Sequence, residues 1–334
     1  MKRVGLEPRD QLPISIRVFT DREPDQEPGR TRRPRLKRSI PREALVFDTE
    51  TYPGPTQQLM VLAWRLYRDD AGAIPGTTCI EEGFAYPDAL AEKDPDGFAR
   101  LVRFVAEHEE RAERLPGFPG LRLMPVSGWL QERFFIYAYK HRDRCDIVVF
   151  NGMFDLGRIA AHWAPARGRY RGGWSLGFWG SKDLEGTWHD ARFHPRLLAL
   201  PIDPLRTLYS WGSLAPKDVE RADATARIVD LHTVVSALTD RNLSLESACR
   251  LFGEDWTKAD VTYGEISPEL LSYALEDVRY TAGLYRAVHR EVAKHTGILI
   301  ELHRCYSPAT IGARYLRAMG LLPPLVKFGG RRAV

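Results

Sequence analysis

Three short apolar runs place the strongest constraint on what this chain can fold into. They are residues 44–47, 59–67 and 147–150, and residues 80–84 form a fourth, weaker candidate. Short uninterrupted apolar runs are typical of strands that are buried on both faces of a sheet. Helical patterns lie between and after the runs. The sequence therefore predicts an α/β fold with a mixed sheet that is covered by helices.

Four stretches have the spacing of amphipathic helices: residues 87–111, 127–139, 267–293 and 307–319. Ser127 is a candidate N-cap, and Ser267 followed by Pro268 suits the start of the third helix. Residues 168–215 differ, because they combine many glycines with tryptophans and short apolar runs. This texture predicts an inserted region of antiparallel strands or a long hairpin.

The charge of the chain is unevenly distributed. Residues 1–42 hold twelve Lys or Arg and six Asp or Glu, whereas residues 43–334 hold 36 basic and 38 acidic residues. Residues 29–42 contain seven basic residues, no acidic ones and two prolines, which predicts an extended arm. Such an arm could contact the phosphates of a nucleic acid, and a solvated linker is the alternative interpretation.

The composition limits the class of protein. The 334 residues are 44% hydrophobic and 28% charged, which is typical of a globular protein with a substantial core. No stretch approaches the roughly 18 consecutive apolar residues of a membrane span, so we expect a cytoplasmic protein with no membrane partner. The predicted layout is a basic arm (1–42), one α/β domain (43–295) and a C-terminal helix with a Gly-Gly segment (296–334).

The first candidate site residues are Asp48 and Glu50, which follow the first apolar run. Two residues apart on an extended backbone, they project to the same face. Neighbouring carboxylates repel each other unless a cation neutralises them, and Mg²⁺ or Mn²⁺ prefers such oxygen ligands. A solvated strand end or a helix cap is the alternative explanation of this pair.

Two further acids lie in helical segments. Asp155 falls in the first turn after the run 147–150, where the helix dipole also favours an acid. Asp277 lies in the long third helix, which is apolar on both sides, so its carboxylate is predicted to point into the interior. Tyr273, one turn earlier, lies on the same helix face as Asp277, and Glu276 is the acid expected to face solvent.

These residues carry a resemblance. The order D-x-E (48–50), N-x-x-F-D (151–155) and Y-x-x-x-D (273–277) is similar to the three motifs of the DEDD superfamily of 3′-5′ exonucleases, in its tyrosine subgroup. Within the superfamily, the chain is most similar to the exonuclease domain of family B DNA polymerases. The resemblance implies a ribonuclease H-like fold, that is, a mixed sheet with helices on both faces.

The resemblance also implies a mechanism. Asp48, Glu50, Asp155 and Asp277 would bind two divalent cations, Mg²⁺ or Mn²⁺, with Asp48 bridging them. One cation would activate a water and the other would stabilise the leaving 3′ oxygen. Tyr273, whose usual pKa is about 10, would orient the attacking water rather than act as a base.

The substrate-binding residues are less fully specified. Asn151 and Phe154 match positions that contact the substrate strand in this family, and Thr49 and Leu231 are assigned to the same set. Ser244 begins an alternative match to the family's S/T-L-x-x-apolar motif. The tryptophans of residues 174–188 could stack on unpaired bases, although packing of the inserted region against the sheet is the simpler interpretation.

The C-terminal residues 328–332 resemble the aromatic-Gly-Gly segment that joins exonuclease and polymerase modules, and a glycine-rich tail without a function is the alternative interpretation. The chain has no polymerase palm motifs. The leading hypothesis is a 3′-5′ exonuclease that releases nucleoside monophosphates from single-stranded DNA or a frayed 3′ end. An RNA-directed exonuclease shares the same chemistry. A non-catalytic DNA-binding accessory domain for a polymerase or primase is the alternative from a different class.

Overall fold

The computed structural model describes residues 41–69, 78–114, 120–141, 144–212, 226–254, 261–319 and 321. The predicted arm, apart from residues 41 and 42, and the predicted Gly-Gly segment lie outside the described residues.

The elements alternate along the chain as the apolar runs predict. The strands are β1 (Glu43–Thr51), β2 (Leu59–Arg68), β3 (Thr78–Tyr86), β4 (Leu121–Pro125), β5 (Cys145–Val149), β6 (His162–Pro165), β7 (Trp174–Gly177), β8 (Gly180–Lys182), β9 (Trp188–Asp190), β10 (Leu197–Asp203), β11 (Arg206–Trp211) and β12 (Ile228–Asp230). The α-helices are α1 (Leu90–Lys93), α2 (Pro95–Arg114), α3 (Val126–Trp129), α4 (Gly152–Ile159), α5 (Leu231–Thr239), α6 (Leu245–Leu251), α7 (Pro268–Ala293) and α8 (Pro308–Ala318). A π-helix (Leu130–Lys140) continues α3, and short 3-10 turns lie at Gly168–Tyr170 and Leu302–Arg304.

The central sheet has six strands in the order β12-β5-β1-β2-β3-β4. β2 runs antiparallel to both of its neighbours, β1 and β3, whereas β5 is parallel to β1 and to β12, and β4 is parallel to β3. The predicted α/β class and mixed sheet are therefore confirmed. The carboxyl ends of β1, β3, β5 and β12 point to the same edge, which is where sites usually form in such sheets.

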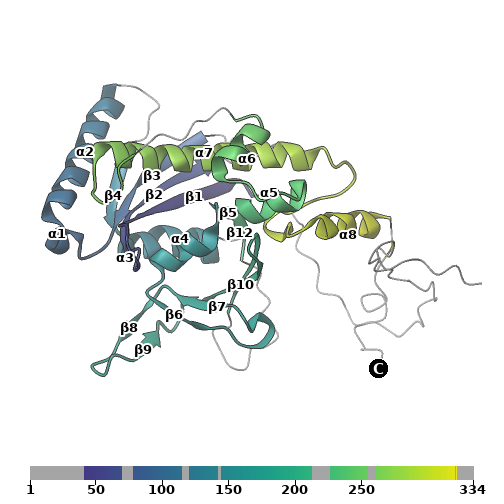
Figure 1. Cartoon of the computed structure of the whole chain (residues 1–334), viewed down its shortest axis with the longest axis horizontal. Helices are drawn as coiled ribbons and strands as arrows, with labels where there is room; N and C mark the ends of the chain where they lie inside the picture. The colour runs from purple at the N-terminus through teal and green to yellow at the C-terminus, as the bar shows by residue number, and fades with distance from the viewer. Residues whose placement is uncertain are drawn as a thin grey trace, which may run out of the picture.

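Each face of this sheet is covered by its own apolar layer (Figure 1). α2, α5, α6 and α7 cover one face, which includes Ala44 and Val46 of β1. The π-helix, α4 and the second sheet cover the other face, which includes Leu45 and Phe47. Because side chains alternate along a strand, the even-numbered residues of β1 point toward α7. This alternation decides where the acids of β1 lie.

The predicted insertion is a second, four-stranded antiparallel sheet in the order β11-β10-β7-β6, with β8 and β9 forming a separate hairpin. It begins at His162, ahead of the predicted start at residue 168, because β6 pairs with β7. Of the tryptophans in residues 174–188, Trp179 is buried against the first sheet, as the packing interpretation expects, and Trp211, outside that stretch, is buried there too. Trp163 and Trp174, by contrast, are 61% and 37% exposed.

Three features of the fold were not predicted. β4 and β12 are too short to produce a clear apolar run. Ser127 does not cap its helix, because its backbone N–H and hydroxyl both donate to Asp88. Leu302 and Cys305 pack into the core below α7, so the folded unit extends beyond the predicted boundary at residue 295.

A buried polar cluster fastens the far half of α7 to the sheet. Asp146 of β5 is 1% exposed and accepts hydrogen bonds from Tyr285 of α7 (2.9 Å) and from the guanidinium of Arg227 (2.9 Å). A buried carboxylate is tolerated only when it is paired in this way. The cluster therefore fixes the position of α7, whose other half carries Tyr273 and Asp277.

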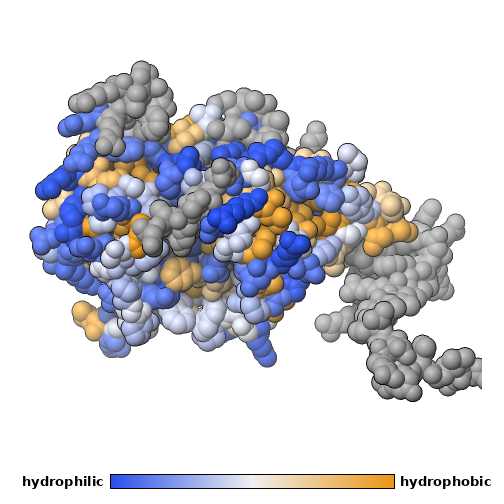
Figure 2. All heavy atoms as spheres, turned by 45° about the horizontal axis from the view of Figure 1, so that its top comes forward, coloured by the Kyte–Doolittle hydropathy of each residue, from blue (hydrophilic) through white to orange (hydrophobic). Residues whose placement is uncertain are grey.

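In the view of Figure 2 most of the surface is polar, and apolar residues form several patches, one of them at the end of the molecule where α8 lies. Leu316, Met319 and Leu321 are each more than 40% exposed there. Among the described residues, no helix combines the length and the apolar character that a membrane crossing demands.

Candidate metal centre

Three carboxylates meet where β1 passes beneath α7. Asp48 and Glu50 point toward α7 from β1, and Asp277 faces them from α7. Each offers one oxygen, and the three oxygens lie within 4.8 Å of one another. Glu50 and Asp277 are each 7% exposed, and Asp48 is partly exposed. The geometry therefore brings together three of the four predicted acids in a set of hard oxygen ligands.

The electrostatics of this cluster are unfavourable without a counter-charge. Burial raises the pKa of Asp48 well above its usual value, and the charges of Asp155, Glu50 and Asp277 raise it further. Like charges this close disfavour simultaneous ionisation. A divalent cation would remove the penalty, because it would attract each of the carboxylates that now repel one another.

Asp155, the fourth predicted acid, approaches Asp48 from α4. Its Oδ1 accepts hydrogen bonds from the Thr49 backbone N–H (3.1 Å) and from the Thr49 hydroxyl (2.6 Å). Burial raises the pKa of Asp155 to about 7. Thr49 is 5% exposed and fixes the orientation of Asp155, so its hydroxyl has a structural role that the sequence-based assignment to substrate binding did not include.

The start of α4 is held by a residue that sequence reasoning missed. Asp230, at the end of β12, accepts hydrogen bonds from the backbone N–H groups of Asn151 (3.1 Å) and Gly152 (3.3 Å), and also caps α5 through the N–H of His232 (3.1 Å). Asn151 adopts a left-handed conformation with φ 62°, which asparagine tolerates better than most residues. The available signal was an acid directly before a helix.

Leu231, predicted to bind substrate, is a core residue. Its side chain is 0% exposed and packs with the apolar layer beneath α7, so it offers no surface to a nucleic-acid strand. The alternative match, Ser244, caps α6 by accepting from the backbone N–H of Ser247 (3.2 Å). Leu231 begins α5 and Ser244 caps α6. The short motif fits both positions because its letters are common at the starts of helices.

Tyr273 lies one turn before Asp277 on α7 and is 6% exposed. Burial raises its pKa far above the usual value, and hydrogen bonds to Asp277 and Tyr263 add to the shift. The hydroxyl therefore stays protonated near neutral pH. Tyr263, which is 45% exposed with its ring centroid 6.4 Å from that of Tyr273, had no signal in the sequence because it lies in a loop without a periodic pattern.

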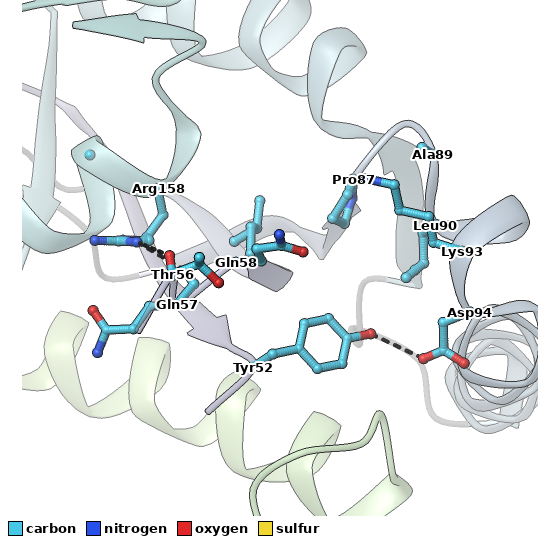
Figure 3. Close-up of a pocket in the computed structure, with 12 residues that line it drawn as sticks. Tyr52, Thr56, Gln57, Gln58, Pro87, Ala89, Leu90, Lys93, Asp94 and Arg158 are labelled. Carbon is cyan, nitrogen blue, oxygen red and sulfur yellow. Dashed lines mark hydrogen bonds between the residues drawn. The ribbon is translucent and has the colours of Figure 1, made fainter. Parts of the chain in front are cut away.

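A cavity of about 680 Å³ lies between the β1–β2 loop, α1 and α4 (Figure 3). Tyr52 points across it and donates a hydrogen bond to Asp94 (3.0 Å). Arg158 donates to the carbonyl oxygens of Thr56 (3.0 Å) and Gln57 (2.9 Å).

Two more residues shape this cavity. Lys93 lines it opposite Arg158. The guanidinium carbon of Arg158 also lies 5.0 Å from the ring centroid of Phe154, a residue predicted to bind substrate. Phe154 is therefore half-buried, and the guanidinium of Arg158 covers its ring.

Comparison of the sequence with protein-family models gave no match, and comparison with curated proteins gave no significant match.

The raised pKa values predict a pH-dependent stabilisation by divalent cations. Asp155, with a pKa of about 7 against a usual 3.8, binds a proton in the folded state that the unfolded chain releases. Stability without metal should therefore fall as pH rises from about 4 to 7. Bound cations replace those protons, so Mn²⁺ at 100 times its Kd should add about 2.7 kcal/mol at pH 8, and less at acidic pH.

Thermal unfolding with and without Mn²⁺ measures this effect. Asp48→Asn should lose the Mn²⁺-induced rise in Tm, and without metal it should melt no lower than wild type at pH 8, because one of the repelling charges is gone. Glu276→Gln, a matched change on α7 outside the cluster, should behave like wild type. Equal Mn²⁺ effects on wild type and Asp48→Asn would show that the cation binds elsewhere.

Proposed function

We propose that this protein is a metal-dependent 3′-5′ exonuclease that hydrolyses single-stranded DNA ends and releases nucleoside monophosphates. The observation that carries the proposal is the meeting of Asp48, Glu50 and Asp277, whose oxygens lie within 4.8 Å of one another. The three motifs of the resemblance come from β1, α4 and α7, which are far apart in sequence. A mixed sheet with helices on both faces also agrees with the expected ribonuclease H-like fold.

The residues present suit divalent cations. The donor set consists of carboxylate oxygens, and burial, together with the charges of the neighbouring acids, raises the pKa of Asp48. Asp48, Glu50, Asp155 and Asp277 would hold the cations, of which the resemblance implies two. Bound Mg²⁺ or Mn²⁺ would supply an activated water and positive charge for the leaving 3′ oxygen.

The protein's own groups orient the reaction. Tyr273 keeps its proton, since burial and the hydrogen bond that it donates to Asp277 raise its pKa. Its hydroxyl oxygen can therefore accept a hydrogen bond from the attacking water and orient it, but it cannot take the proton of that water. Thr49 holds one oxygen of Asp155 through two hydrogen bonds, which restricts the rotation of that carboxylate. Such restraint keeps the acids in one arrangement before substrate binds.

The 680 Å³ cavity supports a nucleotide-sized substrate group. Its lining includes Tyr52, two residues beyond Glu50, and Arg158, three residues beyond Asp155. Tyr52 offers an aromatic surface for the terminal base, and Lys93 and Arg158 offer hydrogen-bond donors for its polar edge and for the sugar. We infer that the terminal nucleotide of the strand occupies this cavity while its phosphodiester lies at the carboxylates.

A cleavage assay with 5′-labelled single-stranded DNA and Mg²⁺ or Mn²⁺ tests the proposal. Wild type should produce a ladder that shortens from the 3′ end. Asp48→Ala should lower the rate by more than about a hundredfold, because the loss of a bound cation removes several kcal/mol of charge stabilisation. Glu276→Gln, one residue from Asp277, should retain wild-type activity. If wild type and Asp48→Ala cleave equally, the proposed site is not responsible.

The role of Tyr273 is tested by Tyr273→Phe, which removes only the hydroxyl. We expect kcat to fall by up to about a hundredfold with little change in KM, because the attacking water loses its orienting hydrogen bond. The shape of the pH–rate profile should not change, since the tyrosine does not titrate in the working range. Tyr280→Phe on the same helix is the control. If the substitution abolished a rise of the rate with increasing pH, Tyr273 would instead be the general base.

A further inference from the structure

A second cavity, of about 930 Å³, lies in the inserted region, away from the carboxylates. Its floor is the solvent-facing side of the second sheet, with His162 from β6 and Ser175 from β7, and its wall is the segment that joins β9 to β10. Arg167, Arg192 and Arg196 line it from different sides. The cavity thus concentrates basic residues that the proposed cleavage site does not use.

The inserted region carries excess positive charge that its own acids do not neutralise. Residues 162–212 contain seven Lys or Arg and four Asp or Glu. Three of the acids are engaged locally: Asp190 with Arg196 (2.7 Å), Asp203 with Arg206 (2.7 Å) and Asp183 with His189 (2.8 Å).

Unlike most of the acids, two of the basic residues in the inserted region have no partner of opposite charge among the described residues. Within the part of the chain that the structure describes, Arg167 and Arg192 form no ion pair, and both are exposed. Because both line the cavity, its wall presents two positive charges that are available to an anionic ligand. This local excess contrasts with residues 43–334 as a whole, in which acidic residues slightly outnumber basic ones.

A rigid aromatic surface lies beside these cations. The Trp188 ring stacks on His162 with ring centroids 5.4 Å apart and planes inclined by 5°. The Trp188 indole N–H donates to Asp190 (2.7 Å), and the same carboxylate holds Arg196. Arg196 also donates to the Ser175 hydroxyl (2.8 Å). This network fixes the tryptophan in one orientation among the residues that line the cavity, with one face of its ring against His162.

We propose that this cavity is a second binding site for single-stranded nucleic acid, at which Arg167 and Arg192 contact phosphates and the part of the Trp188 ring that His162 does not cover packs against an unpaired base. Proteins that bind single strands combine cationic side chains for the phosphates with aromatic side chains for the unpaired bases. In a duplex the bases are paired and stacked, so they could not reach the aromatic ring. The choice of nucleic acid as the ligand rests on the proposed function. The site would hold a part of the strand other than the nucleotide that is cleaved.

Fluorescence anisotropy with a labelled oligothymidylate about 16 nucleotides long tests this site, with EDTA present so that no cleavage occurs. The double variant Arg167→Ser/Arg192→Ser should bind about tenfold more weakly at low salt. The slope of log K against log salt should fall by about 1.4, because each phosphate contact to a single strand contributes about 0.7. The control Arg103→Ser/Arg241→Ser, which removes two exposed arginines outside the insertion, should retain the wild-type slope.

The inference would be overturned if Arg167→Ser/Arg192→Ser bound the oligonucleotide with the same affinity and the same salt slope as the control variant. The result is separable from the cleavage test. Asp48→Ala that fails to cleave but binds like wild type leaves both sites standing. If wild type does not cleave at all but the arginine variant loses binding, only the exonuclease proposal fails. If cleavage depends on Asp48 but the arginine variant binds normally, only the second site fails.

Discussion

The repulsion among buried carboxylates is the interaction on which the rest of the structure depends. Asp48, Glu50 and Asp277 lie together between β1 and α7, and Asp155 adds its charge from α4. Such a cluster costs folding free energy unless cations occupy it. The surrounding structure is therefore built to hold the acids in place. The Asp146 cluster fastens α7 at one end, Asp230 fixes the start of α4, and Thr49 orients Asp155.

Two sites of opposite character follow from this arrangement. The carboxylate site is negative without metal and would repel a phosphodiester, whereas the cavity of the inserted region is positive and would attract one. A strand held first by the insertion would reach the carboxylates only when cations have reversed their charge. Under the proposed function, these two roles would account for the absence of an overall basic excess in residues 43–334.

Much of the fold and of the acid cluster was predictable, because both depend on periodicity. The apolar run at the start of β1 fixes the alternation that places Asp48 and Glu50 on one face, and the apolar pattern of α7 requires Asp277 to point inward. Asp230 and Tyr263 were missed because they act through contacts with segments distant in sequence. Leu231 was misassigned because a short motif matches any helix start, and its burial became evident only from the packing of α5 against α7.

The most direct measurement is a crystal structure of the protein soaked in Mn²⁺, with anomalous difference density recorded at the manganese absorption edge. We expect manganese density in contact with Asp48, Glu50 and Asp277, on the side that Asp155 approaches from α4. Absence of density among these residues at saturating Mn²⁺, with the carboxylates still in the same arrangement, would contradict the proposal that they form a metal centre.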